Sequence, residues 1–248
     1  MKTPPRSHVV ALSGGKDSTA LALRLRELNP DVDYTYVCTP TGDELPEMFA
    51  HWRRLGELLG KRITPVTNIK GLKGVIREQK MLPNFRARFC TRILKIEPYR
   101  VWLKQNTPCV SYVGLRADEE GRAGGAYSDI EGVEMRFPLR EWGWGEADVW
   151  KYLDQRGVSI PYRTDCARCY HQRIGEWWSL WKDHPEAWAD AEADEAELKA
   201  TFRTPGRDSW PTALKDLRLA FEGGRLPKSV KETLTGLRDA GSCRVCSL

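Results

Sequence analysis

The run Ser13-Gly14-Gly15-Lys16-Asp17-Ser18-Thr19 directly follows the apolar stretch Val9-Val10-Ala11-Leu12. The apolar stretch predicts a short buried strand, and leucines at 21, 25 and 28 predict a helix over residues 17–28. A Gly-Gly turn between strand and helix makes an anion cradle. Glycine lets the backbone approach a phosphate, and the first helical turn offers free N–H groups at the positive end of the helix dipole. Lys16 adds a positive charge and three hydroxyl groups add donors, so this junction predicts a phosphate-binding loop.

The spacing of this loop separates it from two better-known phosphate loops. It lacks the G-x-x-x-x-G-K-[ST] pattern of a Walker loop and the G-x-G-x-x-G pattern of a dinucleotide fold. The alternative is a solvated Gly-Gly turn with a surface lysine. The complete run S-G-G-K-D-S resembles the PP-loop of ATP pyrophosphatases, which cleave ATP between the α and β phosphates. That resemblance implies nucleotide contacts along residues 13–19. It also implies catalytic roles for Lys16, which would neutralise the leaving pyrophosphate, and for Asp17, which would help to hold Mg²⁺.

Length, charge and cysteine content limit the classes of protein that this chain can belong to. It has 248 residues, 41% of them hydrophobic, and a net charge of +5. This length accommodates one α/β domain with a smaller appendage, or two small domains. The charge suits an anionic substrate and is too weak to indicate nucleic-acid binding by itself. With no apolar run of about 18 residues and no apolar core of a secretory signal in residues 1–7, we expect a cytoplasmic protein without a membrane partner. Its seven cysteines are then expected to serve metal or redox chemistry rather than disulfides.

Strand-like and helix-like segments alternate through the first half of the chain. Strands are predicted over residues 9–12, 33–39, 62–66 and 109–115, and helices over residues 17–28, 45–59 and 91–104. This alternation predicts an α/β fold with a doubly wound, mostly parallel sheet, in which ligands bind beyond the carboxyl ends of the strands. The PP-loop resemblance implies the adenine nucleotide alpha hydrolase-like version of this fold.

Beyond about residue 139 the composition changes. Eight of the ten tryptophans lie from Trp142 onward, and helices are predicted over residues 146–155, 173–182, 185–200 and 212–221. We predict a nucleotide-binding domain over residues 1–139 and a small helical, cysteine-containing lobe over residues 140–248. Each tryptophan is expected to pack in the core rather than to stack on a base. The acidic stretch 186–197 is expected to be a solvated helix face.

Two further segments follow predicted strands. Thr39-Pro40-Thr41-Gly42-Asp43-Glu44 resembles the T-G-x-E segment of the phosphoadenosine phosphosulfate (PAPS) reductase branch of the PP-loop superfamily, although alone it would indicate a helix N-cap. Gly114-Leu115-Arg116-Ala117-Asp118-Glu119-Glu120-Gly121-Arg122 resembles the G-x-R-x-x-E-x-x-R segment of the same branch. The alternative is a flexible loop with two surface arginines. The resemblance implies nucleotide contacts by Thr41, Gly42, Glu44, Gly114, Arg116 and Arg122.

The cysteines form two C-x-x-C pairs, Cys166–Cys169 and Cys243–Cys246, with Cys90 apart from them. Two such pairs can make a tetrahedral zinc site, three or four thiolates can hold an iron–sulfur cluster, and one pair can be a redox dithiol. Cys38 and Cys109 fall inside predicted strands and are expected to be buried.

The surroundings of Cys90 carry a second resemblance. Residues 90–98 resemble the C-C-x-x-R-K-x-x-P segment of adenylyl-sulfate reductases, which joins a downstream C-x-x-C to hold a 4Fe–4S cluster, although Phe89 replaces the first cysteine. The resemblance implies a cluster on Cys90, Cys166 and Cys169 with Cys246 or Cys243 as fourth ligand, and zinc is the alternative. The remaining C-terminal cysteine, Cys243 in our assignment, would then carry out sulfur chemistry. The basic rim that includes Arg92 and Lys95 would hold phosphates and lower the pKa values of the thiols.

The later segments at 138–150 and 161–166 are similar to PAPS reductase family proteins often encoded by bacteriophages. PAPS reductases lack the lysine and aspartate of the loop and end in E-C-G-L-H, whereas this chain keeps Lys16 and Asp17 and ends differently. We therefore predict an enzyme that binds ATP and adenylates an acceptor for sulfur transfer, as in DNA phosphorothioation or tRNA thiolation. A cysteine desulfurase or a thioredoxin-like reductant would be the sulfur partner, and a nucleic acid is one expected acceptor. The alternatives are a sulfonucleotide reductase that forms sulfite and a non-catalytic nucleotide- or DNA-binding module with structural zinc.

Overall fold

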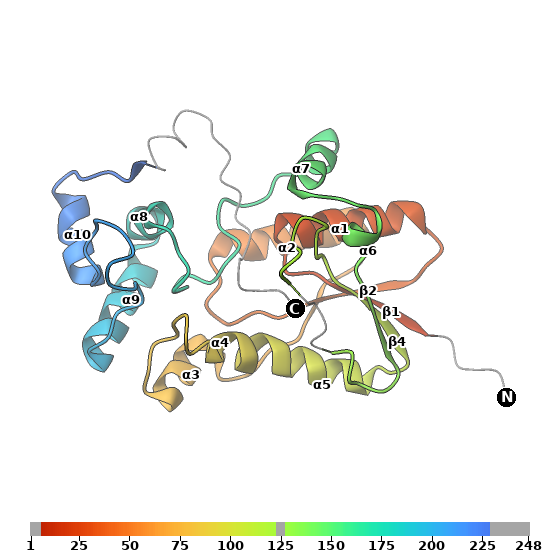
Figure 1. Ribbon diagram of the computed structural model, residues 1–248, viewed down its shortest axis with the longest axis horizontal. Coiled ribbons are helices and arrows are strands. Elements are labelled where there is room, and N and C mark those ends of the chain that lie inside the picture. The colour runs from red at the N-terminus through yellow and green to blue at the C-terminus, as the bar shows by residue number, and fades with distance from the viewer. Residues whose placement is uncertain (1–5, 123–126, 229–248) are drawn as a thin grey trace.

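The computed structural model describes residues 6–122 and 127–228 (Figure 1). A five-stranded sheet in the order β3-β2-β1-β4-β5 forms its centre, and every pair of neighbouring strands is parallel. The strands are β1 (Ser7–Ala11), β2 (Tyr34–Cys38), β3 (Thr64–Pro65), β4 (Cys109–Tyr112) and β5 (Val133–Arg136). The predicted α/β fold is confirmed, and β5 is a strand that the sequence pattern did not predict.

Helices cover both faces of the sheet (Figure 1). On one face, Val10 and Tyr36 share a core with α1 (Lys16–Leu28), α2 (Pro46–Leu59) and α7 (Glu146–Gln155). On the other face, Val9 and Val37 pack against α5 (Glu97–Gln105). The sheet is therefore doubly wound, and the loop between β1 and α1 lies at the carboxyl edge where such sheets bind ligands.

Five further helices pack into a third hydrophobic cluster. These helices are α3 (Gly71–Gln79), α4 (Phe89–Thr91), α8 (Ile174–Asp183), α9 (Pro185–Leu198) and α10 (Leu214–Glu222). Trp177 and Trp188 are buried in this cluster, as expected of core tryptophans. A π-helical turn, η1 (Arg92–Ile96), joins α4 directly to α5, and the short α6 (Pro138–Glu141) precedes α7. Helix α7 lies beyond the predicted domain boundary at residue 139, yet it shares a hydrophobic core with α1. The boundary itself stays a prediction.

Two expectations need correction. The acidic stretch of α9 is not wholly solvated, because Asp194 and Glu195 are each only 7% exposed. The sequence pattern also missed α3, whose two glycines lower its helix propensity.

Among the described helices, none is long and apolar enough to cross a membrane.

Candidate functional site

The loop at residues 13–19 is held by its own hydroxyl groups. Ser18 Oγ accepts a hydrogen bond from Gly14 N at 3.1 Å and donates one to Gly15 O at 3.1 Å, and Ser13 Oγ lies 3.0 Å from Ser18 Oγ. Gly14 has φ +90°, and a Cβ there would lie 2.7 Å from Trp52 Nε1. The loop conformation thus requires glycine at position 14. The expected contact of these hydroxyls with a phosphate stays a prediction, because here they bind the loop itself.

Helix α2 fixes this loop from outside. His51 Nε2 donates to Gly14 O at 2.9 Å, and Trp52 Nε1 donates to Ser13 O at 3.1 Å, so two consecutive side chains hold two consecutive carbonyls. Burial lowers the pKa of His51 to about 4, which keeps the imidazole neutral. Since a carbonyl only accepts, the ring proton is on Nε2. The N–H groups of the first turn of α1 have no acceptor within the helix and are available to an anion.

Four charged residues meet at the start of α1. The Lys16 side chain is only 1% exposed, and its Nζ lies 3.6 Å from Asp17 Oδ2 and 3.3 Å from Glu146 Oε1. Arg116 Nη1 donates to Asp17 Oδ2 at 2.9 Å. Burial raises the pKa of Asp17, while Lys16 and Arg116 oppose that shift. The structure therefore brings together three of the residues assigned to the nucleotide site, Lys16, Asp17 and Arg116, and adds Glu146, which the sequence did not point to. Their contact with a nucleotide stays a prediction.

The segment that carries Arg116 is fixed by Arg140, which sequence reasoning also missed. Arg140 Nη2 donates to Glu119 O at 2.9 Å and to Arg122 O at 2.5 Å. Arg122 itself forms an ion pair with Glu119. Gly114 has a packing role, because a Cβ at that position would lie 3.1 Å from Ser18 N. Its small size lets the chain after β4 pass against the first turn of α1.

The T-G-D-E loop, residues 41–44, closes on itself. The Glu44 carboxylate accepts hydrogen bonds from Thr41 N at 2.6 Å, Thr41 Oγ1 at 2.7 Å and Gly42 N at 3.0 Å. Gly42 has φ +76°, a backbone conformation that glycine adopts without strain. The Glu44 side chain is thus used to shape the loop, and direct contacts of Thr41, Gly42 and Glu44 with a nucleotide stay predictions.

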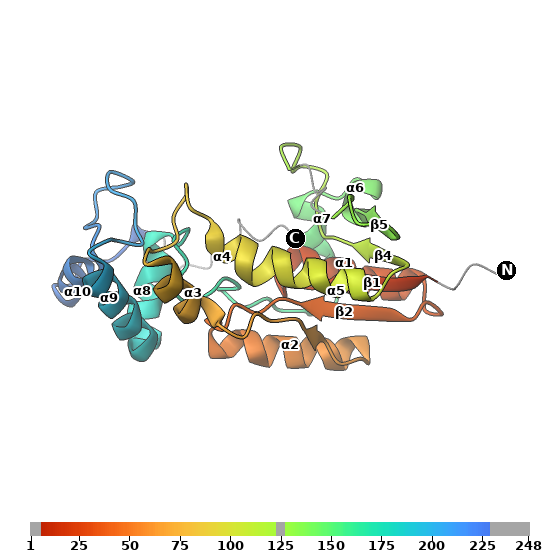
Figure 2. The ribbon, with the colours of Figure 1, turned by 90° about the horizontal axis from the view of Figure 1, so that it is seen from below.

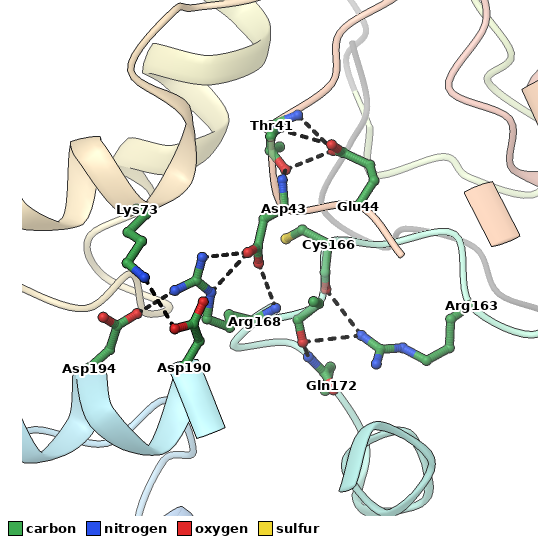
Figure 3. A network of polar contacts seen from close by, with 12 residues as sticks. Thr41, Asp43, Glu44, Lys73, Arg163, Cys166, Arg168, Gln172, Asp190 and Asp194 are labelled. Atoms are coloured by element: carbon green, nitrogen blue, oxygen red, sulfur yellow. Dashed lines mark hydrogen bonds and ion pairs between the residues drawn. The ribbon is translucent and has the colours of Figure 1, made fainter. Parts of the chain in front are cut away.

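Arg168 joins the T-G-D-E loop to the first cysteine pair and to α9 (Figure 3). Its Nε donates to Asp43 Oδ1 at 2.9 Å, its backbone N donates to Asp43 Oδ2 at 2.9 Å, and its Nη1 donates to Asp194 Oδ2 at 2.7 Å. Ala167 N also donates to Asp43 O at 2.6 Å, and Glu44 forms an antiparallel bridge with Cys166. The loop and the cysteine pair are therefore one connected unit. No motif pointed to Arg168, and only its position inside C-x-x-C could have drawn attention to it.

Three of the predicted metal ligands lie near one another. A hydrogen bond with Cys166 and burial raise the pKa of the Cys169 thiol. Burial, followed by Cys166, raises the pKa of the Cys90 thiol to about 11, and Lys95 opposes this shift. The thiols interact in pairs: in the described part of the chain, no three His, Cys, Asp or Glu side chains are arranged to hold a metal ion. These residues alone do not make a ready metal site.

The other cysteines and the two residues of the basic rim lie in different surroundings. Cys243 and Cys246 lie outside the described residues, so their predicted roles stay predictions. Cys38 and Cys109 are buried in β2 and β4, as expected. Arg92 forms an ion pair with Glu97 at 2.5 Å on an exposed part of η1, so its predicted nucleotide contact stays a prediction. Lys95, on the same π-helical turn, is close enough to Cys90 to favour its thiolate, whereas burial keeps the pKa of that thiol high.

The chain is similar to two solved structures and to one family model. A PAPS reductase from Candida auris in a phosphate complex has a TM-score of 0.47 and 15% identity, covering 63% of this chain and 76% of its own. The U34-tRNA thiolase NcsA from Methanococcus maripaludis, with its [4Fe-4S] cluster, has a TM-score of 0.48 and 15% identity, covering 97% of this chain and 76% of its own. A search of curated proteins found no match. Residues 7–171, well over half of the chain, match the phosphoadenosine phosphosulfate reductase domain, so the chain belongs to that family.

Proposed function

We propose that this protein binds ATP at residues 13–19 and adenylates an oxygen of an acceptor, which prepares that oxygen for replacement by sulfur. The burial of Lys16 carries the proposal. Its side chain is 1% exposed, and it lies at the first residue of α1 beside Asp17. A lysine buried at this helix end is suited to meeting the phosphates of a bound triphosphate. A substrate such as PAPS, which is already activated, releases no pyrophosphate and does not need this charge.

In the adenylation step, the acceptor oxygen attacks the α phosphorus. The bond from that phosphorus to the α–β bridging oxygen breaks, and pyrophosphate leaves with the bridging oxygen. Lys16, the N–H groups of the first turn of α1 and Arg116 stabilise the charge that develops on the phosphates. Asp17 Oδ1 is buried and has no hydrogen-bond partner among the described residues, so it fits as a ligand of Mg²⁺ on those phosphates. The metal would add charge neutralisation when it is bound.

In the sulfur-transfer step, the outer sulfur of a persulfide attacks the acceptor atom that carries the adenylated oxygen, and AMP leaves with that oxygen. A thioredoxin-like reductant then reduces the disulfide between the acceptor and the carrier cysteine, which releases the thiolated acceptor and the carrier thiol. Free sulfide attacking the same atom would give the thiolated acceptor directly, without a reductant. The connection through Arg168 supports a single site, because it ties the T-G-D-E loop to the pair Cys166 and Cys169. We propose Cys243 as the sulfur carrier, supplied by a cysteine desulfurase. A 4Fe–4S cluster on Cys90, Cys166, Cys169 and Cys246 belongs to the proposal, and we assign no step to it, since the described thiols meet only in pairs.

The adenylation proposal is tested by product analysis. Anaerobically purified protein is incubated with ATP, Mg²⁺, sulfide and separate pools of nucleic-acid and small-molecule acceptors. We expect AMP and pyrophosphate in equal amounts, and a loss of about a hundredfold or more in Lys16→Met. Lys61→Met is the matched control, because Lys61 pairs with Asp33 at the surface. Release of ADP and orthophosphate alone, or equal activity of the two variants, contradicts the proposal.

A sulfonucleotide reductase remains the second candidate, because the matched family domain is named for that activity. Incubation with PAPS or adenylyl sulfate and reduced thioredoxin distinguishes the two. Sulfite release would assign the reductase activity, whereas we expect none. Metal analysis of anaerobic protein separates iron and sulfide, which we expect, from zinc, which would point to a structural site.

A further inference from the structure

A half-exposed aromatic ring lies on the surface next to the cysteine segment. The Phe85 side chain is 47% exposed, although its ring packs edge-on against Tyr170, with centroids 5.2 Å apart, and against His171, at 4.5 Å. Figure 2 shows the loop before α4, which carries Phe85, rising beside the loop that precedes α10. A ring held by two other rings, with part of its surface in solvent, is a rigid apolar platform.

The loop that carries Phe85 is ordered by its own hydrogen bonds. Asn84 Oδ1 accepts hydrogen bonds from Arg86 N and Ala87 N, both at 2.9 Å, and Asn84 N donates to Ala87 O at 3.2 Å. This turn directs Phe85 and Arg86, both exposed, away from the core. A partner that binds here does not have to order the loop first.

Arg207 lies beside the ring, and Arg86 and Arg88 follow Phe85 closely in the chain. The guanidinium carbon of Arg207 lies 5.9 Å from the Phe85 ring centroid, while its Nη1 donates to Gln172 O at 3.0 Å. Burial lowers the pKa of His171 to about 4, and the next causes are Arg88 and Arg207, so both arginines lie close to that imidazole. Arg86, Arg88 and Arg207 therefore supply positive charge to this surface.

This surface adjoins the thiols. Tyr170, one of the two rings that support Phe85, directly follows Cys169 in the chain. Burial raises the pKa of the Tyr170 phenol, and the Cys90 thiol is the next cause. A molecule resting on Phe85 would thus lie one side chain away from the cysteines.

We propose that Phe85, Arg86, Arg88 and Arg207 form a docking surface for single-stranded nucleic acid, with one base stacked on the Phe85 ring and the arginines on the phosphates. The inference rests on the proposed function, because it identifies the sulfur acceptor as a nucleic acid. Aromatic rings interleaved with arginines are the usual platform for unpaired bases. An acidic protein partner would use the same arginines and would not need the ring. Binding that depends on the Phe85 ring therefore favours a nucleic acid.

Binding of a short labelled single-stranded RNA, and of the DNA of the same sequence, is measured by fluorescence anisotropy without ATP. We expect Phe85→Ala to weaken binding about tenfold and Phe85→Trp to preserve it. Arg86→Glu should weaken binding and reduce the dependence of affinity on salt by about one ion. Phe49→Ala and Arg53→Glu are matched controls, because both residues are exposed on α2.

Equal affinities for Phe85→Ala and Phe49→Ala, or an absence of salt-dependent binding, overturn the proposal. Loss of binding in Arg86→Glu alone, with Phe85→Ala unchanged, shows that the nucleic acid is held by charge without a base on the ring, and this overturns the proposal too. The assay contains no ATP, so it is independent of the adenylation test. Ring-dependent binding together with a failure to release AMP would refute the proposed reaction and leave the docking surface standing.

Discussion

Replacing Arg168 by methionine tests whether the T-G-D-E loop and the cysteine segment depend on one buried ion network. The Asp43 and Asp194 side chains that Arg168 joins are only 9% and 10% exposed. Methionine preserves much of the apolar volume and removes the guanidinium, so both carboxylates lose their main partner. Breaking a buried ion pair by removing one partner costs about 3–5 kcal/mol. This is a large fraction of the roughly 5–15 kcal/mol that stabilises a typical protein.

Equilibrium urea unfolding, followed by tryptophan fluorescence, measures this cost. The matched control is Arg218→Met, because Arg218 also pairs with two carboxylates, Glu192 and Glu222, while its side chain is 33% exposed. Surface pairs contribute about 1 kcal/mol or less, so we expect the control to lose little stability. The reasoning is refuted if Arg168→Met loses no more stability than Arg218→Met.

The pH dependence of the Arg168→Met penalty adds a second test. Burial raises the pKa of Asp194, and Arg168 opposes that shift, so removing Arg168 raises the pKa of this carboxyl further. A folded-state pKa above the unfolded value means that stability increases as pH falls through the folded pKa. We therefore expect the penalty to shrink toward acidic pH, and Asp194→Asn in the same variant to remove that change. A penalty that is constant with pH would show that Asp194 does not carry it.

Three further predictions concern the phosphate loop and α9. Gly14→Ala should abolish nucleotide binding in a calorimetric titration, whereas Gly143→Ala, also at positive φ but with no atom near a Cβ, should lose only stability. His51→Leu should raise the KM for ATP about tenfold by leaving the Gly14 carbonyl without its buried donor, while His51→Gln, which can still donate, should raise it less. Burial raises the pKa of Glu195 from 4.5 to about 7, so unfolding measurements should show stability falling as pH rises through that window, and Glu195→Gln should lack this decline.

Local chemistry made much of this fold predictable. The β1–α1 junction follows from an apolar run, two glycines and a leucine periodicity, which are neighbours in the sequence. Helix α7 was predicted with the bounds that the structure shows. β3 and β5 have two and four residues. Strands this short are recognised by the neighbours they pair with rather than by their own pattern, which is why β5 was missed and β3 was predicted too long.

Composition within one segment could not decide which polar groups are buried. The acidic stretch of α9 looked solvated, because a run of carboxylates normally is. In the fold, Arg168 pairs with Asp194, and the backbone N–H groups of Phe202 and Leu214 donate to the Glu195 carboxylate. Those partners lie outside α9. The expectation that the whole acidic stretch is solvated was therefore wrong, and the sequence of α9 by itself could not show why.

The amino-acid sequence alone predicted the turn at residues 13–19, because its two glycines and the Ser13 and Ser18 hydroxyl groups that bind it lie within the same seven residues. Only the tertiary structure decided what surrounds it: His51 and Trp52 on the loop carbonyls, Glu146 beside Lys16, and Arg168 between the T-G-D-E loop and α9. These contacts join residues 26 to 130 positions apart. A hydrogen bond acts over about 3 Å, so which distant groups come within that range depends on how the sheet and its helices pack.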